Sequence, residues 1–259
     1  MKTFTKNSLI EELIKIRDLG WILNTRKGNH GSVGNTLEDL LGIEENNLPL
    51  PNAAEWELKT TRTNSTSLIT LFHMEPSPKA LKFVPSILLP CFGWKHKSAG
   101  EKYPENEKSF RQTINYGRCS DRGFYIDLDK KEGKICFKFD MNCIDERHEE
   151  WKKQLIKEGS VQLEPYPYWG IDDVLHKIGS KMHNCFFVTA ETKKLNGYEY
   201  FKYDKILMLR SIKKETIFNC FEEKMIYIDF DARTGHNHGT KFRIKESDIK
   251  NLYNEIKEY

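Results

Sequence analysis

The chain has 259 residues, a formal net charge of +3, 38% hydrophobic and 31% charged residues, and a mean hydropathy of −0.65. This composition indicates a folded, rather polar protein, and the longest apolar runs are too short for a helix that spans a bilayer. Six cysteines without Cys-x-x-Cys spacing argue against a zinc ribbon, and the lack of a signal-peptide pattern after Met1 leads us to expect a cytoplasmic protein.

The first part of the chain predicts two helices around a glycine-rich loop. Residues 8–11 form a capping-box pattern that opens a helix through about Asp18. The basic, glycine-rich residues 26–34 are consistent with a phosphate-binding loop and also with a flexible connection. Residues 35–42 then predict a short helix that carries Glu38.

A strand is predicted at residues 55–59, with the sequence Glu-Trp-Glu-Leu-Lys. Because alternate side chains of a strand share a face, Glu55, Glu57 and Lys59 are expected on one face and the two apolar side chains in a core. Two carboxylates, with Glu38 upstream as the second acid, can hold a hard cation such as Mg²⁺ beside a phosphate, and a neighbouring ammonium can orient water. This combination suits metal-dependent hydrolysis of phosphodiesters.

The Glu-x-Lys spacing by itself is also typical of a solvated charged face. It recurs at Glu132/Lys134, Glu150/Lys152, Glu191/Lys193, Glu222/Lys224 and Glu255/Lys257. Glu57 differs in its setting, because a turn signal at Asn52 precedes it, large apolar residues flank it, and an apolar run follows at residues 67–72. Residues 67–73 are the expected hairpin partner of its strand. A charged pair inside an otherwise buried strand is unfavourable unless it has a partner.

The rest of the chain predicts strands interleaved with helices. We expect a hairpin at residues 124–129 and 134–139, helices near 146–158 and 171–182, strands at 185–190, 198–203 and 225–231, a loop at 233–239, and a last capped helix after Ser247. This order predicts an α/β (α+β) core, with a central mixed sheet flanked by helices.

Several short segments in one order resemble those of a known family. They are Lys27-Gly28-Asn29 with Gly31 and Gly34, Leu37-Glu38-Asp39-Leu40-Leu41, Glu45-Asn46-Asn47, Glu55 to Lys59, Leu71-Phe72-His73, Tyr168-Trp169, Ala190-Glu191-Thr192, Phe201-Lys202-Tyr203, His236 to Thr240, and Phe242-Arg243-Ile244. The chain thereby resembles the MvaI/BcnI family of type II restriction endonucleases, which have the PD-(D/E)xK nuclease fold and are related to the mismatch-repair nicking enzyme MutH. The resemblance implies one unit over residues 1–259, with a catalytic lobe over about 1–150 and a DNA-recognition lobe over about 160–259.

The resemblance also implies an active site with Mg²⁺ as its cofactor. Glu57 and Lys59 match the acid and the lysine of the family's active-site strand, and Glu38 matches its helix acid. The family's first acid lies five residues before Glu57, where this chain has Asn52. An amide oxygen can ligate Mg²⁺ but brings no charge. Three explanations stay open: Glu55 or Glu38 substitutes as a metal ligand, the protein is slow, or the Asn was introduced to trap an uncut DNA complex.

Candidate DNA-contacting residues follow from the same resemblance. They are Lys27, Asn29, His30, Arg62, Arg233, His236, His238 and Arg243. Arginine can donate a bidentate pair to guanine, and histidine can donate or accept. His73 matches a histidine near the active site in the BcnI branch, and it can also be read as a polar residue that ends a strand.

The function implied is a Mg²⁺-dependent, sequence-specific endonuclease for double-stranded DNA. We expect a monomer that nicks one strand and then the other, without membrane contact, and a companion methyltransferase in the host. Three alternatives remain: a MutH-like nicking repair enzyme, a DNA-binding module that has lost catalysis because of Asn52, and a small-molecule metal hydrolase built on His236 and His238.

Overall fold

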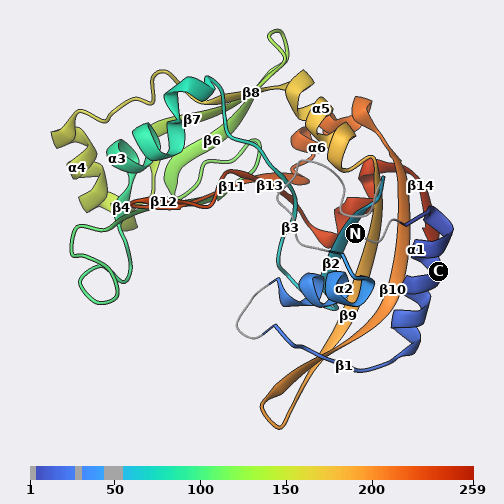
Figure 1. Cartoon of the computed structure of the whole chain (residues 1–259). Helices are drawn as coiled ribbons and strands as arrows, with labels where there is room; N and C mark the ends of the chain where they lie inside the picture. Colours follow the sequence, from blue (N-terminus) through green and yellow to red (C-terminus); the bar gives the residue numbers. More distant parts are fainter. Residues whose placement is uncertain (1–3, 27–30, 44–54) are drawn as a thin grey trace. The chain divides into compact units, whose positions relative to one another are not determined.

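A computed structural model describes residues 4–26, 31–43 and 55–259 of the chain (Figure 1). These residues form two compact units. The first unit comprises Met1–Ile69, His176–Glu215 and Lys245–Tyr259, and the second comprises Thr70–Leu175 and Thr216–Ile244. This division differs from the expected lobes on either side of about residue 150, because the second unit is inserted into the first in two pieces.

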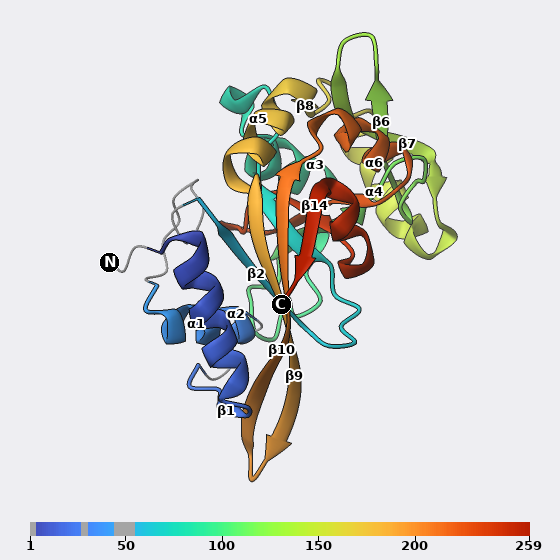
Figure 2. The same cartoon turned by 90° about the vertical axis from the view of Figure 1, so that its right-hand side faces the viewer.

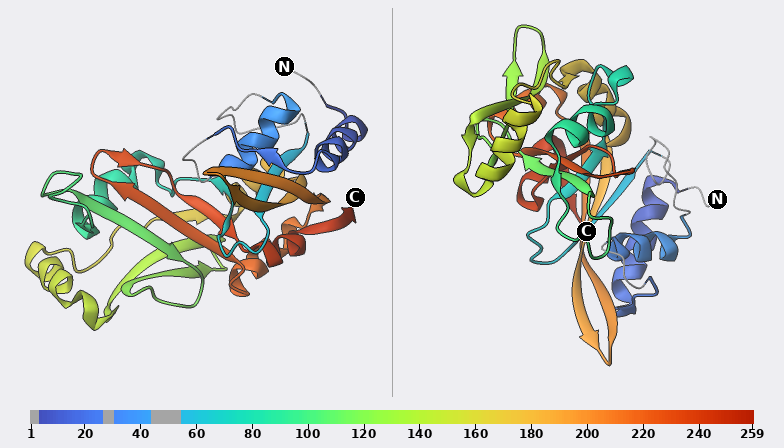
Figure 3. Two further views of the ribbon diagram at one scale, coloured as in Figure 1. Left: turned by 90° about the horizontal axis from the view of Figure 1, so that it is seen from below. Right: turned by 90° about the vertical axis from the view of Figure 1, so that its left-hand side faces the viewer.

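The first unit contains a mixed sheet, as the sequence predicts. Among the described residues its strands are β1 (Ile22–Leu23), β10 (Tyr198–Ile212), β9 (Asn184–Leu195) and β2 (Glu57–Arg62) in spatial order, with β14 (Tyr253–Glu258) also paired to β10. β2 runs parallel to β9, with Glu57 opposite Cys185, and the other pairs are antiparallel. β9 and β10 continue past the other strands as a long hairpin (Figure 3).

Helices α1 (Lys6–Asp18) and α2 (Ser32–Leu41) cover one face of this sheet (Figure 2). Their apolar side chains form a core with Trp56 and Leu58 of the β2 segment. The capping box of α1 lies one turn earlier than predicted, because Thr5 is the N-cap and exchanges hydrogen bonds with Ser8. The predicted box at residues 8–11 was therefore wrong, although the helix itself is confirmed.

α5 (Ile171–Lys181), whose Val174 and Ile178 are buried, and the chain's last helical segment contribute further buried side chains. That segment, Glu246–Leu252, is a 3₁₀ helix, so the prediction of a capped α-helix there was wrong. Its Ile249 and Leu252 are fully buried. The Tyr253 hydroxyl, which follows, donates a hydrogen bond of 2.9 Å to the carbonyl of Met182 and fixes the end of α5.

The second unit contains two sheets among its described residues. In spatial order, the strands of the first are β3 (Ile69–His73), β13 (Lys241–Ile244), β11 (Ile226–Arg233), β5 (Lys108–Ile114) and β4 (Trp94–Lys95), with β12 (His236–Asn237) beside β11. The strands of the second are β6 (Arg122–Asp129), β7 (Lys134–Ile144) and β8 (Tyr168–Gly170). The hairpin of β6 and β7 is confirmed. The expected pairing of residues 67–73 with the Glu57 strand was wrong, because β3 lies beside β13 and β2 lies beside β9.

Aromatic side chains hold the two sheets of the second unit together. Rings from both sheets pack within 7 Å of one another, and they include Phe110, Phe124, Phe137, Trp169, Phe230 and Phe242. Short helices α3 (Leu89–Phe92), α4 (Glu149–Glu158) and α6 (Ile217–Glu222) border these sheets. No helix within the described residues is long and apolar enough to cross a membrane.

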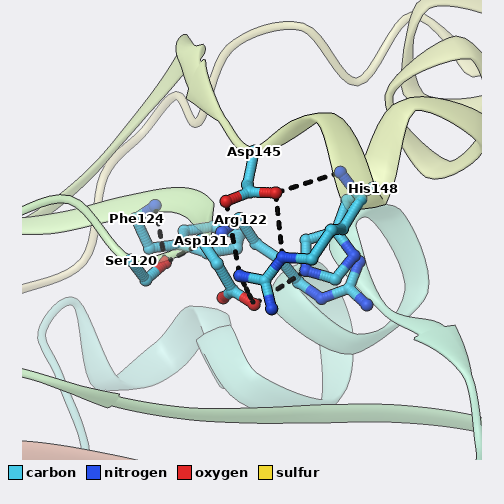
Figure 4. A network of polar contacts seen from close by, with 7 residues as sticks. Ser120, Asp121, Arg122, Phe124, Asp145 and His148 are labelled. Atoms are coloured by element: carbon cyan, nitrogen blue, oxygen red, sulfur yellow. Dashed lines mark hydrogen bonds and ion pairs between the residues drawn. The ribbon is translucent and has the colours of Figure 1, made fainter.

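A polar network joins the start of β6 to the start of α4 (Figure 4). The Ser120 hydroxyl accepts hydrogen bonds from the backbone N–H groups of Arg122 and Phe124, and His148 Nε2 lies 2.7 Å from an Asp121 oxygen. The Arg122 guanidinium lies 4.1 Å from the Trp94 ring centroid and 4.9 Å from that of Trp151. Burial lowers the pKa of Arg122 below its ordinary value.

We expect Arg122→Met to lower the free energy of unfolding by about 2 kcal/mol, because a half-buried guanidinium between two indole rings loses both cation–π contacts. Urea titration followed by tryptophan fluorescence measures this change. The control Arg118→Met, at an exposed position of the same unit, should change the free energy of unfolding by less than about 0.5 kcal/mol. Equal losses for the two variants would show that the indole contacts contribute nothing.

Candidate active site

The first residue of β2, Glu57, carries a carboxylate that is almost fully buried, with 1% of the residue exposed. Trp56 and Leu58 point into the helix-covered core, so the alternation of the strand places Glu57 and Lys59 on the opposite face, as predicted. Lys59 Nζ donates a hydrogen bond of 2.6 Å to Glu57 Oε1. The two residues that the sequence singled out therefore form one ion pair.

A second lysine, Lys181, reaches the same carboxylate from the end of α5. Its Nζ lies 3.8 Å from Glu57 Oε1, and its side chain is 21% exposed. Burial lowers the pKa of Lys181 below its ordinary value, and the negative charges of Glu57 and Glu38 oppose this shift. Lys181 therefore lies within the electrostatic field of both acids that the sequence predicts for this site.

The second oxygen of Glu57 makes the site suitable for a cation. Oε2 is buried, and no group in the described part of the chain forms a hydrogen bond with it. A buried carboxylate oxygen without a donor is unfavourable, and a hard divalent cation is the type of ligand that would satisfy it. Glu57 thus fits a metal such as Mg²⁺, although the described residues contain no cluster of three or more His, Cys, Asp or Glu arranged for one.

Neutral groups lie behind the ion pair. Cys185 of β9 pairs with Glu57 across the parallel strands, and burial raises the pKa of its thiol to about 12. Burial also raises the pKa of Tyr253 well above its ordinary value. Both groups therefore stay protonated at neutral pH, and Lys59 and Lys181 balance the charge of Glu57.

Comparison with known proteins identifies the family. The family model of the MvaI/BcnI restriction endonucleases matches residues 10–253. The chain belongs to the MvaI/BcnI restriction endonuclease family. Two solved structures are similar over nearly the full length of both chains: restriction endonuclease MvaI in complex with its cognate DNA substrate (25% identity, 99% of each chain, TM-score 0.78), and MvaI in the absence of DNA (25% identity, 100% of this chain and 99% of that chain, TM-score 0.53). No curated protein matches the chain.

Membership of this family confirms the resemblance drawn from the sequence and the restriction-endonuclease-like fold. The family also identifies the chain as a nuclease. Of the active-site residues expected from the resemblance, Glu57 and Lys59 lie together. Glu38 lies on α2 and is half-buried, and Glu55 precedes β2 and is exposed. Asn52 lies outside the described residues, as do the candidate DNA contacts Lys27, Asn29 and His30.

Arg62, another candidate DNA contact, lies at the last position of β2. One of its guanidinium nitrogens is 3.2 Å from the Ser32 hydroxyl and 3.4 Å from Glu199 Oε1, and the group lies over the Phe201 ring. Asn24 donates a hydrogen bond of 2.8 Å to the other oxygen of Glu199. Arg62 therefore links β2, α2 and β10, and its contact with DNA stays a prediction.

Arg233 and Arg243, the two arginines predicted to recognise bases, lie in the second unit, and each pairs with a buried acid. Arg243 Nη1 lies 3.1 Å from Asp229 Oδ2, whose other oxygen accepts a hydrogen bond from Thr113. Arg233 Nη1 lies 3.1 Å from Glu107 Oε1. Asp229 is 8% exposed and Glu107 4%. These acids fix the orientation of the two guanidinium groups.

Three histidines of the second unit, His73, His236 and His238, lie at a tight loop. The rings of His236 and His238 pack edge to face with centroids 4.3 Å apart, and both residues are exposed. Glu75 accepts hydrogen bonds from the backbone and hydroxyl of Thr240 and so anchors the loop. A side chain at Gly239 would come within 3.3 Å of His73. His73 therefore packs against this loop at the end of β3, and its predicted catalytic role is still a prediction.

Sequence reasoning missed Lys181. One signal was available, because Lys181 lies in the last turn of the helix predicted near residues 171–182, shortly before the strand predicted at 185–190, and a lysine suits the negative end of a helix dipole. The pairing of that strand with β2 was the missing information. Without it, nothing placed Lys181 beside Glu57.

Proposed function

We propose that the protein is a type II restriction endonuclease that hydrolyses phosphodiesters of a specific double-stranded DNA sequence with Mg²⁺. The observation that carries the proposal is the buried Glu57–Lys59 ion pair, with its unpartnered carboxylate oxygen, in a member of a restriction endonuclease family. The similar MvaI structure contains a cognate DNA substrate, which supports DNA as the substrate here.

In this proposal Glu57 holds the metal through its free oxygen and Lys59 orients the attacking water. Lys59 is suited to this role because its ammonium lies on the same strand face as Glu57 and remains 17% exposed. When bound, Mg²⁺ supplies positive charge that lowers the pKa of water and offsets charge on the phosphate. Trp56 and Leu58 anchor the strand in the core, so the two functional side chains keep a fixed spacing.

Asn52 would supply an amide oxygen to the same metal, with Glu55 or Glu38 as the source of the missing negative charge. An amide ligand binds a divalent cation less strongly than a carboxylate does. We therefore expect the natural activity of this chain to be limited by metal affinity. The same residue supports the runner-up function, a DNA-binding module that has lost catalysis.

DNA recognition is assigned to the second unit. Arg233 and Arg243, each oriented by a buried acid, would read guanines through bidentate contacts, and His236 and His238 on the anchored loop would contact neighbouring base edges. We further propose a cytoplasmic monomer that cuts the two strands in sequence, with a methyltransferase that protects the host. Nicking that requires activation by partner proteins would instead support a MutH-like repair enzyme.

Glu57→Ala and Lys59→Ala are expected to abolish cleavage and to leave DNA binding in Ca²⁺ within about threefold, because both residues act on metal and water rather than on bases. Plasmid cleavage in Mg²⁺ and gel-shift titration in Ca²⁺ measure the two effects. Lys15→Ala, at an exposed position on α1, is the control and should cleave normally. If the parent is inert, the comparison is made in the Asn52→Asp background. Cleavage at the parental rate by either variant would contradict the assigned site.

Asn52→Asp is expected to raise the cleavage rate, with the largest gain at low Mg²⁺, because the site gains a negative charge at the metal. Rates are compared across a range of Mg²⁺ concentrations. A gain that disappears at saturating Mg²⁺ would assign the effect to metal affinity. Equal rates at every concentration would place Asn52 away from the metal and leave Glu55 or Glu38 as the second ligand.

Arg243→Ala is expected to relax discrimination at one base pair of the recognition sequence by about 1–3 kcal/mol. Competition binding in Ca²⁺ against sites with single base changes measures this loss. Thermal melting must accompany it, because the substitution also removes the partner of the buried Asp229 carboxylate. Arg118→Ala, an exposed arginine of the same unit, should leave the order of site preference unchanged. An unaltered preference for Arg243→Ala would remove this arginine from the recognition set.

A further inference from the structure

Two lysines converge on one oxygen of a buried carboxylate. Lys59 Nζ is 2.6 Å and Lys181 Nζ 3.8 Å from Glu57 Oε1, and the lysine side chains are only 17% and 21% exposed. One ammonium is enough to balance one carboxylate. The charge of Glu38 also acts on Lys181, but two ammonium groups held near each other and largely out of water remain unfavourable, so the second lysine needs an explanation.

The position of Lys181 is fixed by the packing around it. Ile178 and Met182, on either side of it in the chain, are almost fully buried. The carbonyl of Met182 accepts a hydrogen bond from the buried Tyr253 hydroxyl. Since the backbone on both sides of Lys181 is held in this way, its side chain is directed to Glu57 by the fold rather than by chance surface contact.

The charge of Lys181 acts against a cation at Glu57. A divalent metal on this carboxylate would meet two ammonium groups in a region with little solvent, where charges interact more strongly than in water. Glu57 Oε2 has no donor within the described residues, so the lysines satisfy only one side of the carboxylate. The two lysines thus contact one oxygen of Glu57 and leave the other available to a stronger cation.

We propose that Lys181 is a positioning residue of the active site, which acts as the counter-charge of Glu57 in the metal-free protein and is displaced when a divalent cation binds that carboxylate. The inference rests on the proposed metal-dependent function of Glu57. It adds a competitor that sets metal affinity: the ammonium of Lys181 holds the Glu57 carboxylate in place before the metal arrives, and weakens metal binding in return.

Metal binding without DNA tests this role directly. Mn²⁺ is titrated at constant ionic strength into the parent, Lys181→Met, Lys181→Arg and Lys177→Met, and free Mn²⁺ is measured by electron paramagnetic resonance. We expect Lys181→Met to bind Mn²⁺ at least about fivefold more tightly, because one repelling charge is removed, and Lys181→Arg to bind as the parent does. Lys177→Met is the matched control from the same helix, and its gain should be clearly smaller.

The outcomes separate this inference from the proposed function. Loss of Mn²⁺ binding in Glu57→Gln supports the metal site, whereas parental binding in that variant overturns the metal site itself. If Glu57→Gln loses the metal and Lys181→Met binds no more tightly than the parent, the role of Lys181 is overturned and the metal site stands. Near-ultraviolet circular dichroism checks the fold, and Lys181→Gln, which is also neutral, replaces the Met variant if that variant unfolds.

Discussion

The structure of the first unit depends on a buried carboxylate at the start of β2, the strand that ends the described order of its sheet. Glu57 follows Trp56, which is anchored in the helix-covered core, so the carboxylate cannot turn toward solvent without moving the strand. A buried negative charge is tolerated only with positive partners. Lys59 from the same strand and Lys181 from α5 supply them. The electrostatic requirement of one side chain thus connects two segments far apart in the chain.

The parallel pairing of β2 with β9 explains how these segments meet. Parallel neighbours require a crossover connection, and here the crossover contains most of the second unit. α5 is the last element of this connection and leads directly into β9, so its C-terminal residue, Lys181, arrives beside the first residue of β2. The insertion that separates Glu57 from Lys181 in sequence is therefore what allows them to meet.

Patterns in the sequence predicted those elements whose formation depends on residues close together in the chain. Three features could be predicted because each depends on neighbours in the chain. They are the alternation in residues 55–59, the turn between β6 and β7, and the helix that ends at Lys181. The partner of β3, the interleaved units and the position of Lys181 depend on pairings between distant segments, which periodicity does not encode. The final helix was misassigned because α and 3₁₀ segments share the same capping residues and nearly the same apolar spacing.

Each unit pairs buried acids with basic side chains, but the basic residue differs: arginine in the second unit and lysine in the first. Asp229 and Glu107 each hold an arginine, whose planar guanidinium can remain bound to a carboxylate while its other donors face a ligand. Glu57 is instead surrounded by lysines, whose single ammonium groups are flexible and can leave. Fixed partners suit the reading of bases, where geometry must be preserved. Exchangeable partners suit the metal-binding role proposed for Glu57.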